Sequence, residues 1–342
     1  MNRSFTLPRR RFLQSAAFLA AAVTTPPLQA RPRLEGFKPG QMKLGCVCWN
    51  FRGIMNGPPW NETIDLIGNM GFDGIELIAA RPNDFETYWK KDSVLTGLKK
   101  QLDKYKLTVS QFALFQTAVE DLSNLDSSKR NRSLDCFEEG CKIAQKLGAP
   151  IINIVAPWAR DLTGPSDYLP RYFAQLQGAP EKKFHLNIAE GFNYEKVWST
   201  FVRTMKDACE RASHYGLNFS LENHTHTLVH DSTAFLKLFG EVNNPILGMN
   251  MDIGWIQLQR EYPPYAIHKV KDHLFNLHIR DIDGPGLVFV GIGDGVMDLQ
   301  AVVDALKTVG YTGYLSFEQD GVPDMIQCMK NAKVLLEKMI GS

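Results

Sequence analysis

Short runs of apolar residues recur along the chain, and each is followed by a stretch whose apolar positions repeat with the period of a helix. Eight β-strands are predicted from these runs, at Lys43–Cys48, Gly74–Ile78, Leu107–Phe112, Ile151–Val155, Leu217–Leu221, Leu247–Met251, Leu274–Ile279 and Gly313–Phe317. Near-continuous apolar strands that alternate with amphipathic helices are typical of a parallel sheet. Eight such units in 342 residues predict an α/β protein with a single closed (β/α)8 barrel, rather than an open doubly wound sheet.

Glycines support the helical half of this pattern. The longest amphipathic segments predict helices over Asn131–Leu147, Tyr194–Tyr215 and Leu299–Val309. Each is followed directly by a glycine, at Gly148, Gly216 and Gly310. A glycine just after the last helical turn is the expected left-handed cap, so these helices are predicted to end where the pattern ends.

One connection is much longer than the others. About residues 156–192 separate the fourth strand from its helix, and this stretch includes Trp158, Tyr168, Tyr172, Phe173 and His185. Connections of this length are usually functional or disordered. Because the segment is rich in aromatic residues, we interpret it as a folded lid or as a contact surface for a homo-oligomer, not as a flexible linker.

The N-terminal residues 1–30 have the pattern of an export signal rather than of a folded element. Arg9, Arg10 and Arg11 precede Phe12, and an Ala-rich apolar stretch follows before the sequence Leu-Gln-Ala ending at Ala30. This resembles a twin-arginine signal peptide, with a disordered basic N-terminus as the alternative. The apolar stretch is far shorter than the roughly 20 residues that span a bilayer. We therefore expect a periplasmic protein without a membrane anchor, whose barrel occupies residues 31–342.

Composition and charge narrow the classes of partner. The chain is 44% hydrophobic and 22% charged, which is ordinary for a globular protein with a sizeable core. Residues 1–30 hold four of the 38 basic residues and no acidic one, so the remainder has 38 − 4 = 34 basic and 37 acidic residues, a net charge of −3. Without a basic stripe, neither a nucleic acid nor an anionic membrane surface is an expected partner.

The six cysteines do not form a recognisable framework. None belongs to a CxxC motif, and no paired spacing is visible. Cys46 and Cys48 lie two apart on a predicted strand and so share one face. Buried free thiols are favoured there over a disulfide.

Chemistry in a barrel of this kind lies where the strands end. Four consecutive predicted strands end in acidic or imidazole side chains, at Glu222, Asp252, His278 and Glu318. A single such residue would more often be a helix cap, a salt-bridge partner or a surface histidine. The repetition on four neighbouring strands instead predicts a site for one divalent metal ion, since three carboxylates and one imidazole suit Mn²⁺ first, with Co²⁺, Mg²⁺ or Zn²⁺ as alternatives.

Further residues lie near the same rim. His224 follows Glu222 by two positions and shares its face, so it is a candidate for substrate contact. Glu76 ends the second strand and is a candidate for substrate or for support of a ligand, with a structural role as the alternative. Asp281 is a candidate to orient a metal ligand. Trp49 and Trp158 could form apolar walls for a sugar ring, although aromatic residues near a rim are more often packing.

Several short motifs carry a resemblance to a known family. They are Gly71–Leu77 (GFDGIEL), Leu221–His224 (LENH), Met251–Gly254 (MDIG), Leu277–Asp281 (LHIRD), Gly293–Gly295 (GDG) with Asp298, Gly310–Tyr314 (GYTGY) and Glu318–Asp320 (EQD). From about Met42 to Leu336 the chain resembles the xylose isomerase-like TIM barrel superfamily, which includes sugar isomerases, ketose 3-epimerases and inosose dehydratases. The resemblance implies that Glu222, Asp252, His278 and Glu318 hold the metal and that Glu222 and Glu318 do acid–base work.

Two positions depart from the superfamily's pattern. Trp255 stands where many members have a histidine that touches the substrate, and Arg280 stands where many have a lysine. We keep both as candidate substrate-binding residues. Arg280 is a good bidentate partner for a carboxylate or phosphate, and a salt bridge at the rim is an equally good interpretation of it.

These observations lead to one main hypothesis and two alternatives. The main one is a metal-dependent sugar isomerase or epimerase that works through an enediolate. The first alternative is a lyase or dehydratase of the same superfamily, such as an inosose dehydratase or a 3-keto-glycoside eliminase. The second is a sugar-binding barrel without catalysis. A periplasmic address would favour unphosphorylated sugars or glycosides as the small-molecule partner.

Overall fold

The computed structural model describes residues 42–159, 162–163, 187–188, 190–284, 288–319 and 321–341. The predicted signal peptide and most of the 156–192 insertion lie outside the described residues. Both the export signal and the lid or oligomer role of the insertion therefore stay predictions.

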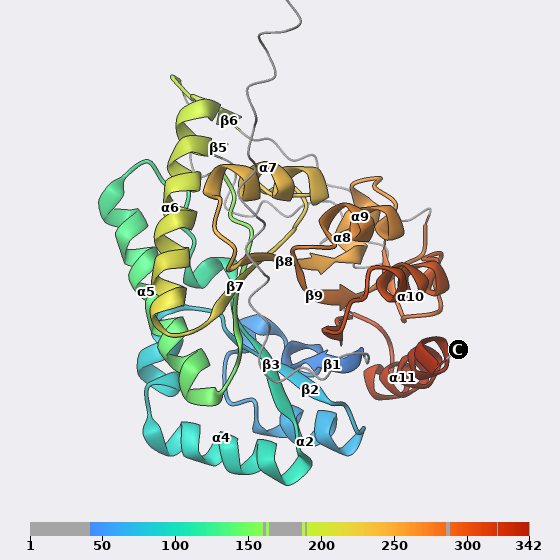
Figure 1. Cartoon of the computed structure of the whole chain (residues 1–342). Helices are drawn as coiled ribbons and strands as arrows, with labels where there is room; N and C mark the ends of the chain where they lie inside the picture. The colour runs from blue at the N-terminus through green and yellow to red at the C-terminus, as the bar shows by residue number, and fades with distance from the viewer. Residues whose placement is uncertain are drawn as a thin grey trace, which may run out of the picture. The chain divides into compact units, whose positions relative to one another are not determined.

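The eight predicted strands form a closed parallel barrel (Figure 1), which confirms the predicted fold class. Around the barrel the order is β1, β12, β9, β8, β7, β4, β3, β2. Their bounds are β1 Lys43–Val47, β2 Gly74–Ala79, β3 Thr108–Leu114, β4 Ile151–Val155, β7 Asn218–Glu222, β8 Leu247–Asp252, β9 Leu274–Ile279 and β12 Tyr314–Phe317. The predicted boundaries differ from these by at most two residues.

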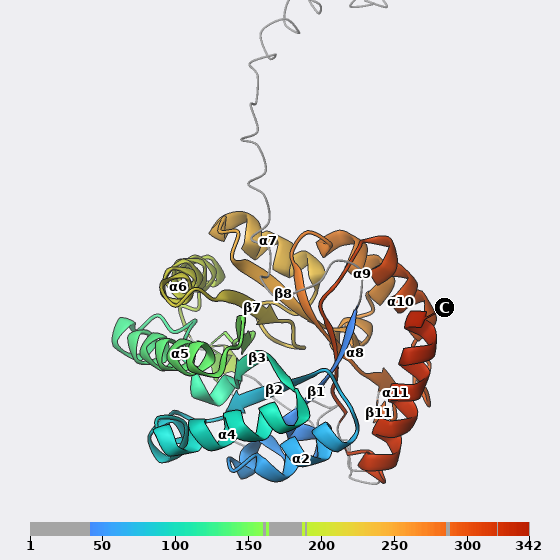
Figure 2. The same cartoon turned by 60° about the horizontal axis from the view of Figure 1, so that its bottom comes forward.

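Helices surround the strands (Figure 2) and bury their apolar faces against the outside of the barrel. The α-helices are α2 Asn61–Asn69, α3 Pro82–Asp84, α4 Asp92–Tyr105, α5 Ser127–Leu147, α6 Tyr194–His214, α7 Ser232–Val242, α8 Ile253–Leu258, α9 Pro263–Val270, α10 Leu299–Thr308 and α11 Met325–Gly341. The predicted glycine caps are present in the left-handed region, with φ of 74° at Gly148, 70° at Gly216 and 68° at Gly310. Only glycine takes this conformation without steric cost, which explains why the helices end there.

Two small hairpins extend from the rim of the barrel. β5 (Leu162–Thr163) pairs antiparallel with β6 (Asn187–Ile188), so the two ends of the long insertion lie side by side. β10 (Asp281–Ile282) pairs with β11 (Phe289–Val290) directly after β9. The second hairpin matters for the site, because it carries residues over the end of the barrel that no strand prediction identified.

The cysteines agree with the expectation of buried free thiols. All six cysteines are free, and four of them are buried: Cys46, Cys48, Cys141 and Cys209. Burial raises the pKa of the Cys46 thiol to about 12, which makes it unreactive at neutral pH. Within the described part of the chain, none of the helices is both long enough and apolar enough to cross a membrane.

Candidate active site and metal centre

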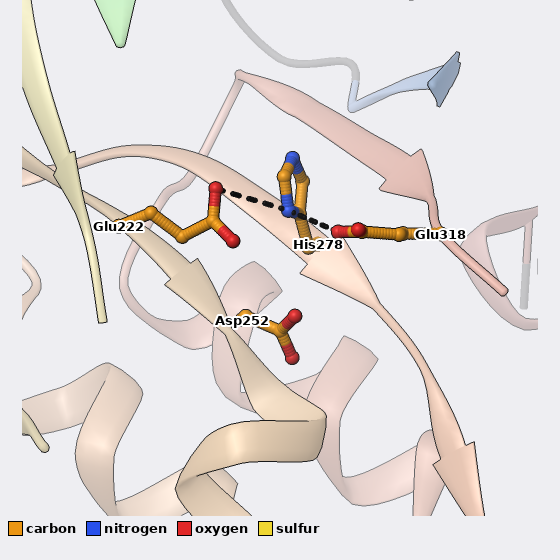
Figure 3. Close-up of side chains that lie close together, drawn as sticks. All are labelled: Glu222, Asp252, His278 and Glu318. Carbon is orange, nitrogen blue, oxygen red and sulfur yellow. Dashed lines mark ion pairs between the residues drawn. The ribbon is translucent and has the colours of Figure 1, made fainter. Parts of the chain in front are cut away.

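The four strand-end residues predicted as metal ligands meet in one cluster (Figure 3). Glu222 and Asp252 are the last residues of β7 and β8, His278 lies near the end of β9, and Glu318 directly follows β12. One ligand atom from each lies within 4.8 Å of the others, and all four side chains are buried. The barrel brings them together because these four strands are neighbours and their carboxyl ends share one rim.

His278 is at the centre of this arrangement. Its Nδ1 lies 2.6 Å from Glu318 Oε2 and 3.6 Å from Glu222 Oε2. In Figure 3 the two glutamates approach this nitrogen from two sides. The same edge of the imidazole therefore faces both carboxylates that the sequence predicts for acid–base work.

Asp252 is held on its backbone and on its side chain. Asn223 accepts a hydrogen bond from Asp252 N at 2.9 Å and donates one to Asp252 O at 3.2 Å. The Asp252 carboxylate also caps helix α8 by accepting from Trp255 N at 3.1 Å. These contacts fix the carboxylate at the rim, so it does not depend on any metal ion for its position.

Arg280 joins two of the candidate ligands. Its Nε donates to Asp252 Oδ2 at 2.6 Å, and its Nη2 pairs with Glu318 Oε1. The guanidinium carbon lies 5.3 Å from the centre of the Trp255 ring and 4.6 Å from that of Phe289. Arg280 lines the cavity, as expected of a substrate-binding residue, but its charged end is engaged by the two carboxylates.

Negative charges outnumber positive charges among the buried side chains of the cluster and its neighbours Glu76 and Arg280. Four carboxylates are at most 4% exposed there, namely those of Glu76, Glu222, Asp252 and Glu318. Arg280 supplies one positive charge and His278 at most one more, so at least two negative charges (4 − 2) lack a counter-charge when all carboxylates are ionised. Buried charges are costly unless paired. A divalent cation would supply the missing charge, and the donor set fits such an ion.

Burial and the neighbouring charges shift the pKa values of the four cluster residues. Burial raises the pKa of Asp252 to about 7 and also raises that of Glu222. Burial alone would raise the pKa of Glu318 too, but Arg280, His278 and a hydrogen bond from Trp49 outweigh it and lower that pKa to about 2. Burial would lower the pKa of His278, yet the surrounding carboxylates raise it well above its ordinary value. Without a metal ion, protons and Arg280 partly neutralise the cluster.

Glu76 lies behind His278 and is fully buried. His278 Nε2 is 2.9 Å from Glu76 Oε2, on the side of the imidazole away from Glu318. A neutral ring with its proton on Nε2 would donate to Glu76 and would present Nδ1, the nitrogen that faces Glu318 and Glu222, to a metal ion. Glu76 is not among the described residues that line the cavity, and it contacts the candidate ligand His278, which is the arrangement expected of a residue that supports a ligand. Glu76 points inward from the middle of β2, below the rim.

A layer of polar side chains fills the barrel beneath the cluster. We call it the polar ring, and its members are at most 4% exposed: Glu76, Gln111, Asn153, Ser220, Glu222, Asn250 and Asn276. Asn276 on β9 reaches Glu76 on β2, two strands that are not neighbours, so the contacts cross the interior of the barrel. Interiors of such barrels are usually filled by branched apolar residues, which makes this layer a feature of the site and not of packing alone.

The contacts of the polar ring form a closed circuit between Glu76 and Glu222. On one side, Gln111 Nε2 donates to Glu76 at 2.7 Å, and Ser220 Oγ lies 3.1 Å from Gln111 Oε1 and 2.8 Å from Asn153 Oδ1. Asn153 Nδ2 then donates to Glu222 Oε2 at 3.3 Å.

On the other side, Asn250 Nδ2 donates to Glu222 Oε2 at 3.1 Å, and Asn276 Nδ2 donates to Asn250 Oδ1 at 2.9 Å and to Glu76 Oε1 at 2.8 Å. Two amides thus hold one oxygen of Glu222, the residue that the sequence assigns to both metal binding and catalysis. These amides come from β4 and β8, the two strands that flank β7.

Replacing Glu76 by Gln tests whether this residue supports the metal ligand. Glu76→Gln keeps the shape and one acceptor oxygen but removes the charge behind His278, so we expect metal affinity to fall about 10–100-fold. The measurement is competition with a fluorescent chelator. Glu241→Gln is the matched control, because Glu241 also accepts an N–H, from Trp198 at 2.9 Å, on the outside of the barrel. An unchanged dissociation constant would limit Glu76 to a structural role.

The cluster opens into a cavity of about 840 Å³. His224, Trp255 and Trp49 line it, as the sequence suggested for all three. The rings of His224 and Trp255 lie 4.3 Å apart, and burial lowers the pKa of His224 to about 4, so this imidazole is neutral at neutral pH. Trp49 Nε1 donates to Glu318 Oε1 at 2.8 Å, which gives it a polar contact as well as a place in the wall.

Two other residues singled out in the sequence lie elsewhere. Asp281 accepts backbone N–H bonds from Gly293, Gly295 and Met297 at 3.0–3.1 Å, so it orders the turn before α10 and does not orient a metal ligand. Trp158 donates to Gln116 at 3.3 Å and is not among the described residues that line the cavity.

Sequence reasoning missed the amides of the polar ring and the residues of the β10–β11 hairpin. The signal for the amides was present, because Asn153, Asn250 and Asn276 each interrupt an apolar strand, and the last two lie two residues before a strand-end ligand. Residues two apart share a face, so they had to point into the barrel. The hairpin had no comparable signal, since each of its strands has only two residues.

Comparison with known proteins places these features in a family. The family model described as xylose isomerase-like TIM barrel matches residues 64–334. Fructoselysine 3-epimerase of Escherichia coli O157:H7 is 24% identical over 253 residues, which cover 73% of this chain and 81% of that protein.

Two solved structures illustrate the shared fold. D-psicose 3-epimerase from Clostridium cellulolyticum H10 superposes with a TM-score of 0.68 at 16% identity, covering 87% of this chain and 99% of that one. A probable 3-DHS dehydratase from Bacillus anthracis superposes with a TM-score of 0.65 at 16% identity, covering 86% and 99%. At this identity the likeness concerns the fold. With the match over most of its length, the closed barrel and the strand-end cluster, the chain belongs to the xylose isomerase-like TIM barrel family.

Proposed function

We propose that the protein is a divalent-metal-dependent sugar epimerase or isomerase that moves a proton on a carbon next to a carbonyl group. The observation that carries the proposal is the placement of Glu222 and Glu318 on two sides of His278, at the end of a cavity large enough for a sugar. Two carboxylates that flank a substrate can remove a proton from one face of a carbon and return it to the same or the other face.

The residues of the chain divide this work. Glu222, held by Asn153 and Asn250, and Glu318, held by Trp49 and Arg280, would transfer the proton. Such transfers typically contribute about 10²–10⁴-fold each. A divalent metal ion held by Glu222, Asp252, His278 and Glu318 would act as a Lewis acid that stabilises the negative charge of an enediolate. Oxygen-rich donor sets suit Mn²⁺, Co²⁺ or Mg²⁺, and Zn²⁺ is the remaining candidate.

Deuterium exchange provides the direct test of this chemistry. The purified protein, supplemented in turn with each of these metal ions, would be incubated in D₂O with free ketoses, ketose–amine conjugates and 3-keto-glycosides, and followed by NMR. Incorporation of deuterium next to the carbonyl, with an epimer or isomer as product, is the expected result. The proposal is wrong if none of the sugars in the panel incorporates deuterium, whichever metal ion is added.

A lyase or dehydratase is the second candidate. The fold is shared with a probable dehydratase, and removal of the same proton can lead to loss of a group on the next carbon. The exchange experiment separates the two outcomes. An epimerase returns the proton and gives a saturated product, whereas a lyase gives an unsaturated product with new absorbance in the ultraviolet.

From the sequence of residues 1–30, we also propose that the protein is exported by the twin-arginine route. Replacing both Arg9 and Arg10 by Lys keeps the positive charge but removes the paired arginines, so we expect the precursor to remain in the cytoplasm with its N-terminal segment attached. Cell fractionation and mass spectrometry of the N-terminus measure this. Replacing Arg31 and Arg33, which lie beyond the predicted cleavage site, by Lys is the matched control. Processing that is unaffected by the Arg9 and Arg10 change would contradict the twin-arginine assignment.

A further inference from the structure

The cavity has two chemically different parts. Its charged and imidazole groups gather at the candidate metal cluster, where His224 and Arg280 lie beside Glu222 and Glu318. Among the described residues that line the rest of the cavity, Asp294 is the only charged one. Among these described residues, a ligand would therefore find ionic and hydrogen-bonding partners at one end of the cavity and few at the other.

Apolar side chains from several separate segments form the other part. We call it the apolar wall, and its main members are Phe115, Val155, Phe289, Val290, Val322 and Pro323. They come from the loop after β3, the end of β4, the strand β11 and the loop after β12. Because four segments contribute, the wall is a built feature of the rim and not the side of one exposed strand.

The wall is also held in place. The ring of Phe289 packs 5.0 Å from that of Trp255 in an edge-to-face arrangement and lies 4.6 Å from the guanidinium of Arg280. Arg280 in turn pairs with Asp252 and Glu318. Through Phe289 the apolar wall contacts Arg280, which pairs with two candidate metal ligands, and both parts line one cavity.

A free monosaccharide suits only the polar part. Its hydroxyl groups would lose water against the apolar wall without gaining a partner, and burying a polar group in this way is unfavourable. The cavity volume of about 840 Å³ lies in the upper part of the range for pockets that bind drug-sized molecules. An apolar group attached to the sugar would fill this space and gain from leaving water.

We propose that the substrate is a keto-sugar glycoside whose aglycone is an apolar aryl or alkyl group. This rests on the proposed function for the orientation, in which the keto-sugar lies at the cluster and the aglycone lies against the apolar wall. The wall then determines specificity, because the reacting part of such substrates is the same whatever the aglycone.

Binding of a matched ligand pair tests this. Calorimetry on the metal-supplemented mature chain would compare the phenyl and methyl β-glycosides of one 3-keto-sugar, with phenyl expected to bind roughly tenfold tighter or more. Val290→Asn and Val322→Asn place an amide in the apolar wall at half-buried positions and should reduce this ratio to about threefold or less. Val334→Asn is the matched control, because Val334 is 67% exposed on α11, and should leave the ratio at its wild-type value.

The outcomes separate this inference from the proposed function. Equal affinities, a preference for methyl, no binding of either ligand, or a preference that survives both wall substitutions would overturn the inference. Deuterium exchange on the same two ligands is read separately. A preference for the phenyl ligand without any deuterium exchange would contradict the proposed function and still support the specificity of the apolar wall. Deuterium exchange without a phenyl preference would support the proposed function and contradict the specificity of the apolar wall.

Discussion

Replacing Glu222 by Gln is expected to lower turnover by about 10²–10⁴-fold while the protein stays folded and still binds its sugar. The amide has the shape of the carboxylate and can keep an oxygen toward the cluster, but it cannot accept a proton. Asn153 and Asn250, which donate to one oxygen of Glu222, can still donate to the amide oxygen of Gln. The effect should therefore appear in the chemical step and not in folding.

The measurement is the rate of deuterium exchange at saturating sugar, together with calorimetric binding of the same sugar. Glu337→Gln is the matched control, since Glu337 pairs with Lys333 on the exposed side of α11. Retained exchange in Glu222→Gln would remove this residue from the acid–base pair. If wild type and variant bind sugar alike and neither shows exchange, the protein is better described as a sugar-binding barrel.

Replacing Asp252 by Ala is expected to reduce metal content from about one ion per chain to nearly none. Asp252 offers a carboxylate that Asn223 and the first turn of α8 hold at the cluster, and alanine offers no metal-binding atom in its place. Without Asp252, Arg280 would still pair with Glu318, and the remaining carboxylates would offer a weaker site. Elemental analysis of the purified mature chain and of the variant measures the difference.

A control at the N-cap of a second helix distinguishes loss of the metal ion from loss of helix stability. Asp252→Ala removes the N-cap of α8, which costs on the order of 1 kcal/mol in its own right. Asp298 caps α10 in the same way, accepting from Ala301 N at 3.0 Å, but lies outside the cluster, so Asp298→Ala should lose a similar amount of stability and no metal. An ion that remains bound in Asp252→Ala, or no ion in the wild type even after soaking, would contradict the assigned metal centre.

The barrel and the set of strand-end residues could be predicted from the sequence because both follow from simple periodicities. Apolar runs locate strands, and the rule that parallel strands of a barrel end at one rim places Glu222, Asp252, His278 and Glu318 together. Glu76 could not be assigned in this way, because a period of two tells which face a side chain takes but not its depth along the barrel axis. Its contact with His278 depends on the stagger between strands.

The apolar wall was beyond prediction for a different reason. Phe289 lies in the two-residue strand β11 and Val322 lies in the loop after β12, and both segments are too short to show a helical or strand period. Their positions depend on long-range contacts, such as that of Phe289 with Arg280. Sequence patterns therefore described the reacting end of the cavity better than the end that we expect to select the substrate.

The polar ring has a consequence for how this sequence can change through evolution. Gln111, Asn153 and Asn250 each donate to one neighbour and accept from another, Asn276 donates to two, and Ser220 has one proton for two acceptors. A change at one position leaves partners unsatisfied at the next, so a single substitution is expected to be harmful where a paired one is tolerated. We expect these positions to be inherited as a block, with compensating changes, and the loops of the cavity to diversify freely around them.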